Sequence, residues 1–206
     1  FVVSGSDLRA QAFRALATRQ LGQSYDLFTR YLINNPSDAW SYSGLSAVSL
    51  LLGDFKEAEE YAKQGYTIRP DEYTSSMMGY IYGVRHEYSP AEAIYEKALR
   101  INSDYLPARF NLACMRIRLK KYDQAMQVLQ EIKKIDTFST IMQAKIYNNL
   151  GYLDWQLGHP KEALEKFEKA VKIEPNYAIA EKNIEKIIRK TSGQLVNENS
   201  FVEQKV

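Results

Sequence analysis

The stretch NNLGYLDWQLGHP, residues 148–160, gathers side chains that could do chemistry. It holds two asparagines, Asp154, Trp155 and His159, which is one of only two histidines in the chain. Catalysis would require a base such as His159 to be held beside a nucleophile or a metal cluster. Whether these residues meet that requirement depends on the elements that position them.

The remaining chemistry-bearing residues give little support to an enzyme. His86 and His159 both fall in predicted turns between helices, far apart in the chain, so they do not converge easily. Asp154 and Trp155 are consecutive and would point about 100° apart on a helix. Cys114 is the only cysteine, which excludes an internal disulfide and a cysteine cluster for zinc or iron–sulfur chemistry. We therefore expect no enzymatic activity, no cofactor and no metal.

The bulk composition is that of a folded globular protein. Apolar residues make up 45% and charged residues 25% of the 206 positions. The 27 basic and 25 acidic residues form no long run of one sign, so we expect no nucleic-acid partner. No apolar run approaches the roughly 18 residues that a membrane-spanning helix needs, so we expect no integral membrane segment.

The chain repeats itself with a period of about 34 residues. Four segments superimpose on an alanine near the start of a predicted helix: Ala58, Ala91, Ala125 and Ala163. Upstream of each lies a second helical segment with a small residue at the matching place: Ser46, Gly79, Ala113 and Gly151. Apolar residues in the later segments recur with the spacing of one helical face. Each unit is therefore predicted to be a helix, a turn and a second helix, with the small residues where the backbones approach most closely.

Turn chemistry predicts where these helices begin. Ser89 and Glu92 read as a capping box, Asp54 and Glu57 read as another, and His159-Pro160 opens a helix. In the first unit the predicted turn, at Leu21-Gly22, lies about three residues later than the turn does in the other units. Four extra residues between 139 and 144 are expected to extend a helix by about one turn or to lengthen a loop.

With this pattern, the sequence resembles the tetratricopeptide repeat family. The repeat at 144–177 carries the family's pattern at Tyr147, Leu150, Gly151, Ala163, Phe167, Ala170 and Pro175. The resemblance implies an all-α, right-handed superhelical solenoid of antiparallel helix pairs. Its expected units are a degenerate one at 5–38, four more at 39–71, 72–105, 106–139 and 144–177, a capping helix at 178–190 and a polar tail at 191–206.

The resemblance also implies a concave groove, lined by the first helix of each pair, that binds peptides. Mapped onto this sequence, its aromatic members are Trp40, Tyr73, Tyr80, Phe110, Tyr152 and Trp155, with Lys145 beside them. Asparagines recur at the sixth position of three first helices, at Asn111, Asn149 and Asn183. An amide can pair with both groups of a peptide backbone. The alternative is that these asparagines belong to the repeat consensus and that the aromatic rings are core residues.

The function expected on these grounds is a non-enzymatic scaffold or adaptor, chaperone-like in its action, that binds a protein or peptide partner in a neutral aromatic groove. Family members that bind the acidic C-terminus of a chaperone use a carboxylate clamp of lysine, asparagine and arginine at five positions. This sequence lacks the required residue at three of the five, so such a C-terminus is not the expected ligand. The alternative is a self-associating structural subunit, and therefore a homo-oligomer. The start FVVSGS adds a further alternative, a bacterial envelope assembly factor in the periplasm or anchored to a membrane, if it is the remnant of an export signal. Without such a signal, a cytoplasmic location is expected.

Overall fold

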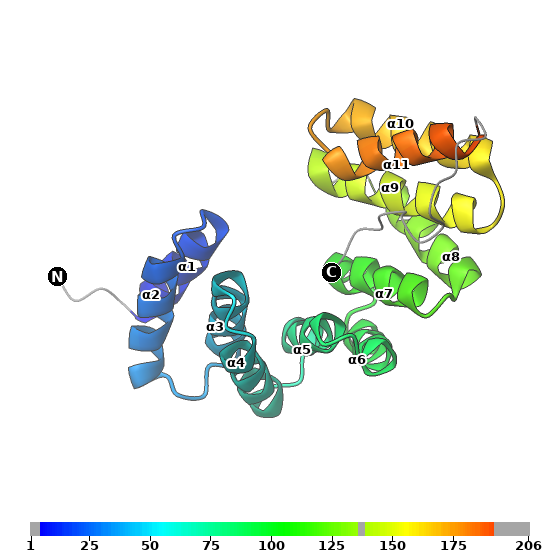
Figure 1. The fold of residues 1–206 in the computed structure, drawn as a ribbon. Coiled ribbons are helices and arrows are strands. Elements are labelled where there is room, and N and C mark those ends of the chain that lie inside the picture. Colours follow the sequence, from blue (N-terminus) through cyan, green and yellow to red (C-terminus); the bar gives the residue numbers. More distant parts are fainter. Residues whose placement is uncertain (1–4, 136–138, 192–206) are drawn as a thin grey trace. The chain divides into compact units, whose positions relative to one another are not determined.

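A computed structural model describes residues 5–135 and 139–191, and these ranges contain eleven helices and no strand (Figure 1). The helices are α1 (Gly5–Ala17), α2 (Leu21–Asn34), α3 (Ala39–Leu52), α4 (Phe55–Ile68), α5 (Glu72–Val84), α6 (Tyr88–Ile101), α7 (Leu106–Arg118), α8 (Tyr122–Lys133), α9 (Thr140–Gln156), α10 (Pro160–Ile173) and α11 (Ala178–Thr191). Most of the FVVSGS start and nearly all of the polar tail lie outside the described residues. None of the described helices is both long and apolar enough to cross a bilayer.

The chain divides into two compact units, which we describe separately. The N-terminal unit runs to Ala108 and contains α1 to α6, and the C-terminal unit runs from Arg109 and contains most of α7 and all of α8 to α11. Consecutive helices pack as pairs: α1 with α2, α3 with α4, α5 with α6, and α9 with α10. The all-α architecture of helix pairs predicted from the repeat is confirmed.

Small residues bring the two helices of a pair together. The hydroxyl of Ser24 donates a 2.9 Å hydrogen bond to the carbonyl of Ala12, and the hydroxyl of Ser46 donates one of 2.7 Å to the carbonyl of Ala58. All four residues are fully buried. Serine therefore replaces alanine or glycine at this contact without leaving a buried hydroxyl unsatisfied.

Large side chains fill the space that glycines leave. A methyl group added at Gly44 would lie 2.3 Å from the ring of Phe28, and one added at Gly79 would lie 2.9 Å from the ring of Tyr95. Phe28 and Tyr95 are among the largest fully buried side chains. Phe28 packs against the neighbouring pair, whereas Tyr95 packs against the first helix of its own pair.

One left-handed residue marks the turn inside each pair. These residues have positive φ angles: Arg19 (57°), Gly53 (86°), His86 (62°), Lys120 (58°) and Gly158 (85°). The late turn expected at Leu21-Gly22 is wrong, because α2 already begins at Leu21. The turn sits at Arg19, which adopts the conformation that glycine favours, so no glycine marks it in the sequence.

Two of the three predicted helix starts need correction. Helix α10 begins at Pro160 with His159 before it, as predicted. Helix α6 begins at Tyr88 after Glu87, so the predicted box at Ser89 is wrong and lies inside the first turn. Asp54 does cap α4 by accepting from the amide of Glu57. The carboxylate of Glu57 instead accepts from the hydroxyls of Tyr25 and Ser49, at 2.7 Å each, and so ties α4 to α2 and α3.

The C-terminal unit contains the longest helix. Helix α9 has 17 residues against 13 or 14 in α3, α5 and α7, so the extra residues before position 144 extend a helix. Phe167 and Ala163 of α10 form a core with Ile187 of α11. Helix α11 thereby covers one side of the last pair.

Candidate functional site

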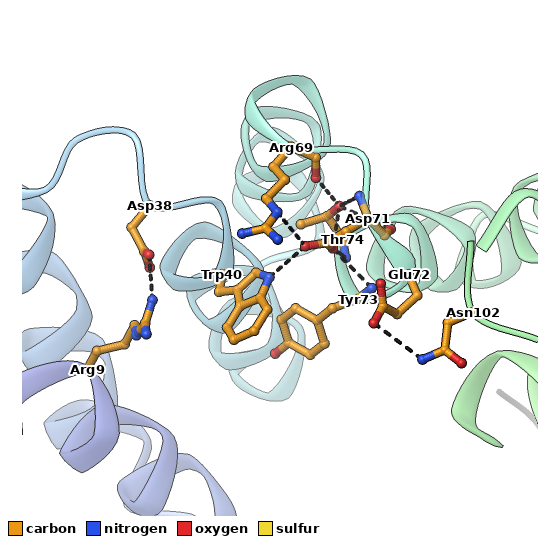
Figure 2. A network of polar contacts seen from close by, with 9 residues as sticks. All are labelled: Arg9, Asp38, Trp40, Arg69, Asp71, Glu72, Tyr73, Thr74 and Asn102. Atoms are coloured by element: carbon orange, nitrogen blue, oxygen red, sulfur yellow. Dashed lines mark hydrogen bonds and ion pairs between the residues drawn. The ribbon is translucent and has the colours of Figure 1, made fainter. Parts of the chain in front are cut away.

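Trp40 is part of the network of polar contacts that Figure 2 shows. It is the second residue of α3, and its side chain remains 38% exposed. The indole Nε1 donates a hydrogen bond of 2.8 Å to the carboxylate of Asp71. This bond joins the start of α3 to the start of α5, two first helices in successive pairs.

Asp71 is the capping residue of α5. Its carboxylate accepts from the amides of Tyr73 (3.1 Å) and Thr74 (3.0 Å), and the Thr74 hydroxyl accepts from the amide of Asp71, which completes a capping box. Burial alone would raise the pKa of Asp71. The Thr74 amide, the Trp40 indole, the Thr74 hydroxyl and the Arg69 charge outweigh burial and lower that pKa below its usual value.

Two guanidinium groups lie close to the Trp40 ring. The Cζ atoms of Arg9 and Arg69 lie 5.5 Å and 5.8 Å from its centroid, within the range of a cation–π contact. Each arginine also pairs with an aspartate: Arg9 with Asp38 at 2.7 Å, and Arg69 with Asp71 at 3.1 Å. The two arginines and the two aspartates therefore balance in charge, so the surface directly around Trp40 is aromatic and close to neutral.

Contacts between aromatic rings extend this surface over three first helices. The ring of Tyr73 in α5 lies 6.0 Å from that of Trp40 in α3 and 6.2 Å from that of Phe13 in α1, edge to face in both cases. Burial, with the nearby Tyr105 and Asp71, raises the pKa of Tyr73. Tyr80 lies two turns further along α5, is half-buried, and has its pKa raised by burial. Both tyrosines are therefore neutral at physiological pH.

We call Arg9, Phe13, Trp40, Arg69 and Tyr73 the aromatic face. Sequence reasoning identified Trp40 and Tyr73 but missed the other three. In the degenerate unit 5–38, Arg9 occupies the position that Phe110 has in unit 106–139, and Phe13 the position that Tyr80 has in unit 72–105. The mapping used for the other groove residues would therefore have found both. Arg69 lies in the segment between α4 and α5, outside the first helices, so no groove position of the repeat maps to it.

Three of the predicted groove residues in the C-terminal unit are buried. Phe110 is 6% exposed, and Asn149 and Asn183 expose nothing. The amide nitrogen of Asn183 donates a 3.0 Å hydrogen bond to Asn148, and the Asn149 amide lies 3.5 Å from the sulfur of Cys114. This differs from the expected peptide-binding ladder: these amides connect α7, α9 and α11 to one another. A side chain without exposed surface cannot contact a partner in this conformation.

The other groove residues predicted in this unit, Asn111, Lys145, Tyr152 and Trp155, are partly exposed. Tyr152 and Trp155 pack against the core formed by Ala163, Phe167 and Ile187. The Nζ of Lys190 in α11 lies 5.2 Å from the centroid of the Trp155 ring. Tyr152 and Trp155 therefore lie where α9 meets α11.

The stretch at 148–160 serves packing. Asp154 is buried and forms an ion pair with Lys166 of α10. His159 is exposed at the start of α10, and His86 is exposed in the turn before α6. Neither histidine is buried: the Nδ1 of His86 lies 2.8 Å from the hydroxyl of Tyr88 in an exposed contact two residues further along the chain.

Sequence comparison identifies the repeat. Profiles described as tetratricopeptide repeat match residues 41–72, 85–145 and 144–177, which together make up more than half of the chain. The chain belongs to the tetratricopeptide repeat family. The fold of this family is typically a non-catalytic scaffold for protein interactions, and the helix pairs described above are its repeats. Among curated protein sequences, none matches the chain significantly.

Solved structures with the tetratricopeptide fold are similar to this chain. TTC0263, a thermophilic tetratricopeptide protein of Thermus thermophilus, matches with a TM-score of 0.71 at 19% identity, over 90% of this chain and 99% of its own. YrrB, described as having an unusual peptide-binding site, matches with 0.62 at 18%, over 86% and 90%. A chain of the Cut9–Hcn1 complex matches with 0.83 at 17%, over 90% of this chain and 36% of its own. At these identities the likeness shows the fold alone.

Proposed function

We propose that this protein is a scaffold or adaptor that holds a segment of a partner protein on the aromatic face of its N-terminal unit. The observation that carries the proposal is the alignment of Phe13, Trp40 and Tyr73, from three successive first helices, in edge-to-face contact. Tryptophan, tyrosine and arginine are the residues most enriched among those that dominate binding energy at interfaces. No catalytic role is proposed.

The face suits a segment with an apolar or aromatic anchor. The exposed part of the Trp40 ring offers the apolar surface, and the guanidinium groups beside it offer N–H donors for backbone carbonyls. Asp38 and Asp71 hold both arginines in place before a partner arrives. Because the side chains are already ordered, binding loses less conformational entropy.

Two further observations support the proposal. Tyr80 continues the predicted groove along α5, and its half-buried ring would extend the contact area for an elongated segment. YrrB, which has the same fold, is described as binding a peptide at an unusual site. The recognition expected here would be neutral and aromatic, in agreement with the failure of the carboxylate-clamp positions.

Peptides selected from a random library against the purified chain test the proposal. We expect binders with aromatic or proline anchors whose affinity falls about tenfold or more in Trp40→Ala and by a smaller factor in Tyr80→Ala. The melting temperature of each variant shows whether the fold survives. Binders that keep their affinity in both variants would place the site elsewhere.

A second candidate function, self-association, is favoured by an exposed apolar cluster. Leu51, Leu52 and Phe55, at the turn between α3 and α4, are 47%, 59% and 59% exposed. Exposed apolar clusters of this kind mark interaction surfaces. Light scattering distinguishes the two functions. A monomer at all concentrations would exclude self-association, whereas a dimer that dissociates in the Leu52→Glu variant would support it.

A further inference from the structure

The two units of the chain carry opposite net charges. Residues 1–108 contain 10 basic and 13 acidic residues, a net charge of −3, whereas residues 109–206 contain 17 basic and 12 acidic residues, a net charge of +5. The two values sum to the +2 of the whole chain. Complementary charge attracts two surfaces and selects which of them meet. The N-terminal unit of one copy is therefore attracted to the C-terminal unit of another.

The N-terminal unit has an acidic surface with an apolar centre at the turn between α3 and α4. Leu51, Leu52 and Phe55 form the exposed apolar cluster there, and the exposed Asp54 lies next to Phe55 in the chain. Residues 54–60 contain four acids and one base. We call Leu51, Leu52, Asp54, Phe55 and Glu59 the acidic edge.

Ion pairs with neighbouring residues offset only part of this acidic charge. Glu59 pairs with Lys63 and with Arg85, and Arg85 also pairs with Glu87 at the start of α6. The hydrogen bond from Lys63 lowers the pKa of Glu59, so this carboxylate is ionised at neutral pH. With these residues included, residues 54–63 and the turn before α6 hold five acids against three bases, and the surface remains net negative.

The C-terminal unit has a basic surface at the turn between α7 and α8. Arg116, Arg118, Lys120 and Lys121 lie within six consecutive residues. Helix α7 holds no acidic residue, and the first turn of α8 holds one, Asp123. The residues of this turn therefore sum to a positive charge.

The next turn of the same unit adds an apolar residue and another base. The hydroxyl of Tyr122, the first residue of α8, donates a hydrogen bond of 3.5 Å to the side-chain oxygen of Gln156, the last residue of α9. Leu157 follows Gln156 and is 39% exposed, and Lys161 is exposed in the first turn of α10. Even with Glu162 counted, the two turns hold five bases against two acids. We call Arg118, Lys120, Lys121, Leu157 and Lys161 the basic edge.

The two edges complement each other as the two sides of an interface do. Each has exposed apolar surface with charges around it, and the charges of the two edges differ in sign. An apolar centre with a polar rim is the usual anatomy of a protein interface. An anionic membrane or a nucleic acid would attract the basic edge alone and would leave the acidic edge uncovered. A second copy of the chain accounts for both edges.

We propose that the chain associates head to tail, with the acidic edge of one copy bound to the basic edge of the next. The inference rests on self-association, the second candidate function, and names the two surfaces that meet. Their apolar side chains form the centre of the contact, and Asp54 and Glu59 face the bases. A dimer joined by one such contact leaves one edge of each kind open, so further copies add to it or the assembly closes into a ring.

Sedimentation equilibrium of the full chain tests this pairing. Leu52→Glu changes the acidic edge, and the double variant Lys120→Glu, Lys121→Glu changes the basic edge. Each should raise the dissociation constant of self-association about tenfold or more, because the first places a charge in apolar surface and the second turns two attractions into repulsions. An equimolar mixture of the two should form a dimer that does not grow further, because each chain keeps one intact edge of a different kind.

The matched control is Lys169→Glu, Lys172→Glu on α10, which changes the net charge as the basic-edge variant does and lies outside both edges. It should change the dissociation constant less than about twofold. Raising the salt from about 0.1 M to about 1 M should weaken the self-association of the wild type, because the screening length falls from about 10 Å to about 3 Å.

Three results would overturn the inference. A wild-type chain that stays monomeric at all concentrations would exclude it together with self-association. A dimer that dissociates in Leu52→Glu but not in the basic-edge variant would keep self-association and exclude the head-to-tail contact. A mixture of the two variants that stays monomeric would exclude that contact as well.

Trp40→Ala separates this inference from peptide binding on the aromatic face. The substitution should release the library peptides and leave self-association unchanged, because Trp40 belongs to neither edge. Loss of self-association in Trp40→Ala would place the contact between copies on the aromatic face instead.

Discussion

The indole of Trp40 donates a 2.8 Å hydrogen bond to the carboxylate of Asp71, and that same carboxylate caps helix α5. One aspartate therefore orders the ring that is exposed to a partner and fixes the first turn of the next repeat. A substitution at Asp71 should therefore change both the stability of the first turn of α5 and the order of the Trp40 ring. A substitution at a residue that only lines the surface should change binding and leave stability unaltered.

Asp71→Ala is expected to lower the free energy of unfolding by about 1–2 kcal/mol near pH 7, because the helix loses its cap and the indole loses its acceptor. The pKa of Asp71 is lowered in the folded protein, so its stabilising effect is full above its usual value of 3.8 and is lost as the pH falls through the folded value. Urea titrations of the wild type and of Asp71→Ala at several pH values measure the difference between their free energies of unfolding. A difference that grows on acidification would contradict a stabilising, ionised Asp71.

Gly44→Ala should destabilise the N-terminal unit by about 1–3 kcal/mol, although alanine favours a helix more than glycine does. The new methyl group would lie 2.3 Å from the buried ring of Phe28. Gly22 in α2 is the matched control, because nothing lies within 4 Å of a methyl group added there. Gly22→Ala should raise the free energy of unfolding by roughly 0.5–1 kcal/mol. Similar effects from both substitutions would refute the packing described for α3.

Lys120→Gly should stabilise the protein by about 0.5–1 kcal/mol, since Lys120 holds a φ of 58° that costs an L residue more than it costs glycine. Gly158→Ala, at the corresponding turn of the next pair, should destabilise it by a similar amount. Thermal melts of the two variants measure both shifts. Shifts of the same sign would contradict a shared turn conformation.

Asn183→Ala tests whether the buried amides support the packing of the C-terminal unit. The substitution leaves the side-chain Oδ1 of Asn148 without the 3.0 Å hydrogen bond from Asn183, which should lower the free energy of unfolding by about 1–3 kcal/mol. Chemical denaturation measures this loss. Unchanged stability, with loss of library peptides that bind the wild type, would restore the asparagine ladder as a peptide contact.

The sequence was a good guide to the fold because each repeat needs small residues where helices cross. Ala58, Ala91 and Ala163 lie at those crossings, and the extra residues before position 144 lengthen α9. Exposure within a helix was harder to predict. Neighbouring positions differ by about 100°, so a small rotation of α9 decides whether Asn149 faces a groove or the next helix.

The aromatic face shows why some functional residues could not be found from the sequence. Arg69 reaches the Trp40 ring from a segment 29 positions later in the chain, and nothing in the local pattern of that segment requires it.

The affinity of library-selected peptides for Trp40→Ala, compared with Phe55→Ala, tests the central claim most directly. Phe55 is a matched control because it is an exposed aromatic residue of the same unit, on a second helix and outside the aromatic face. We predict that Trp40→Ala raises the dissociation constant about tenfold or more and that Phe55→Ala changes it less than about twofold. Equal effects, or a larger effect at Phe55, would contradict the assignment of the aromatic face as the binding site.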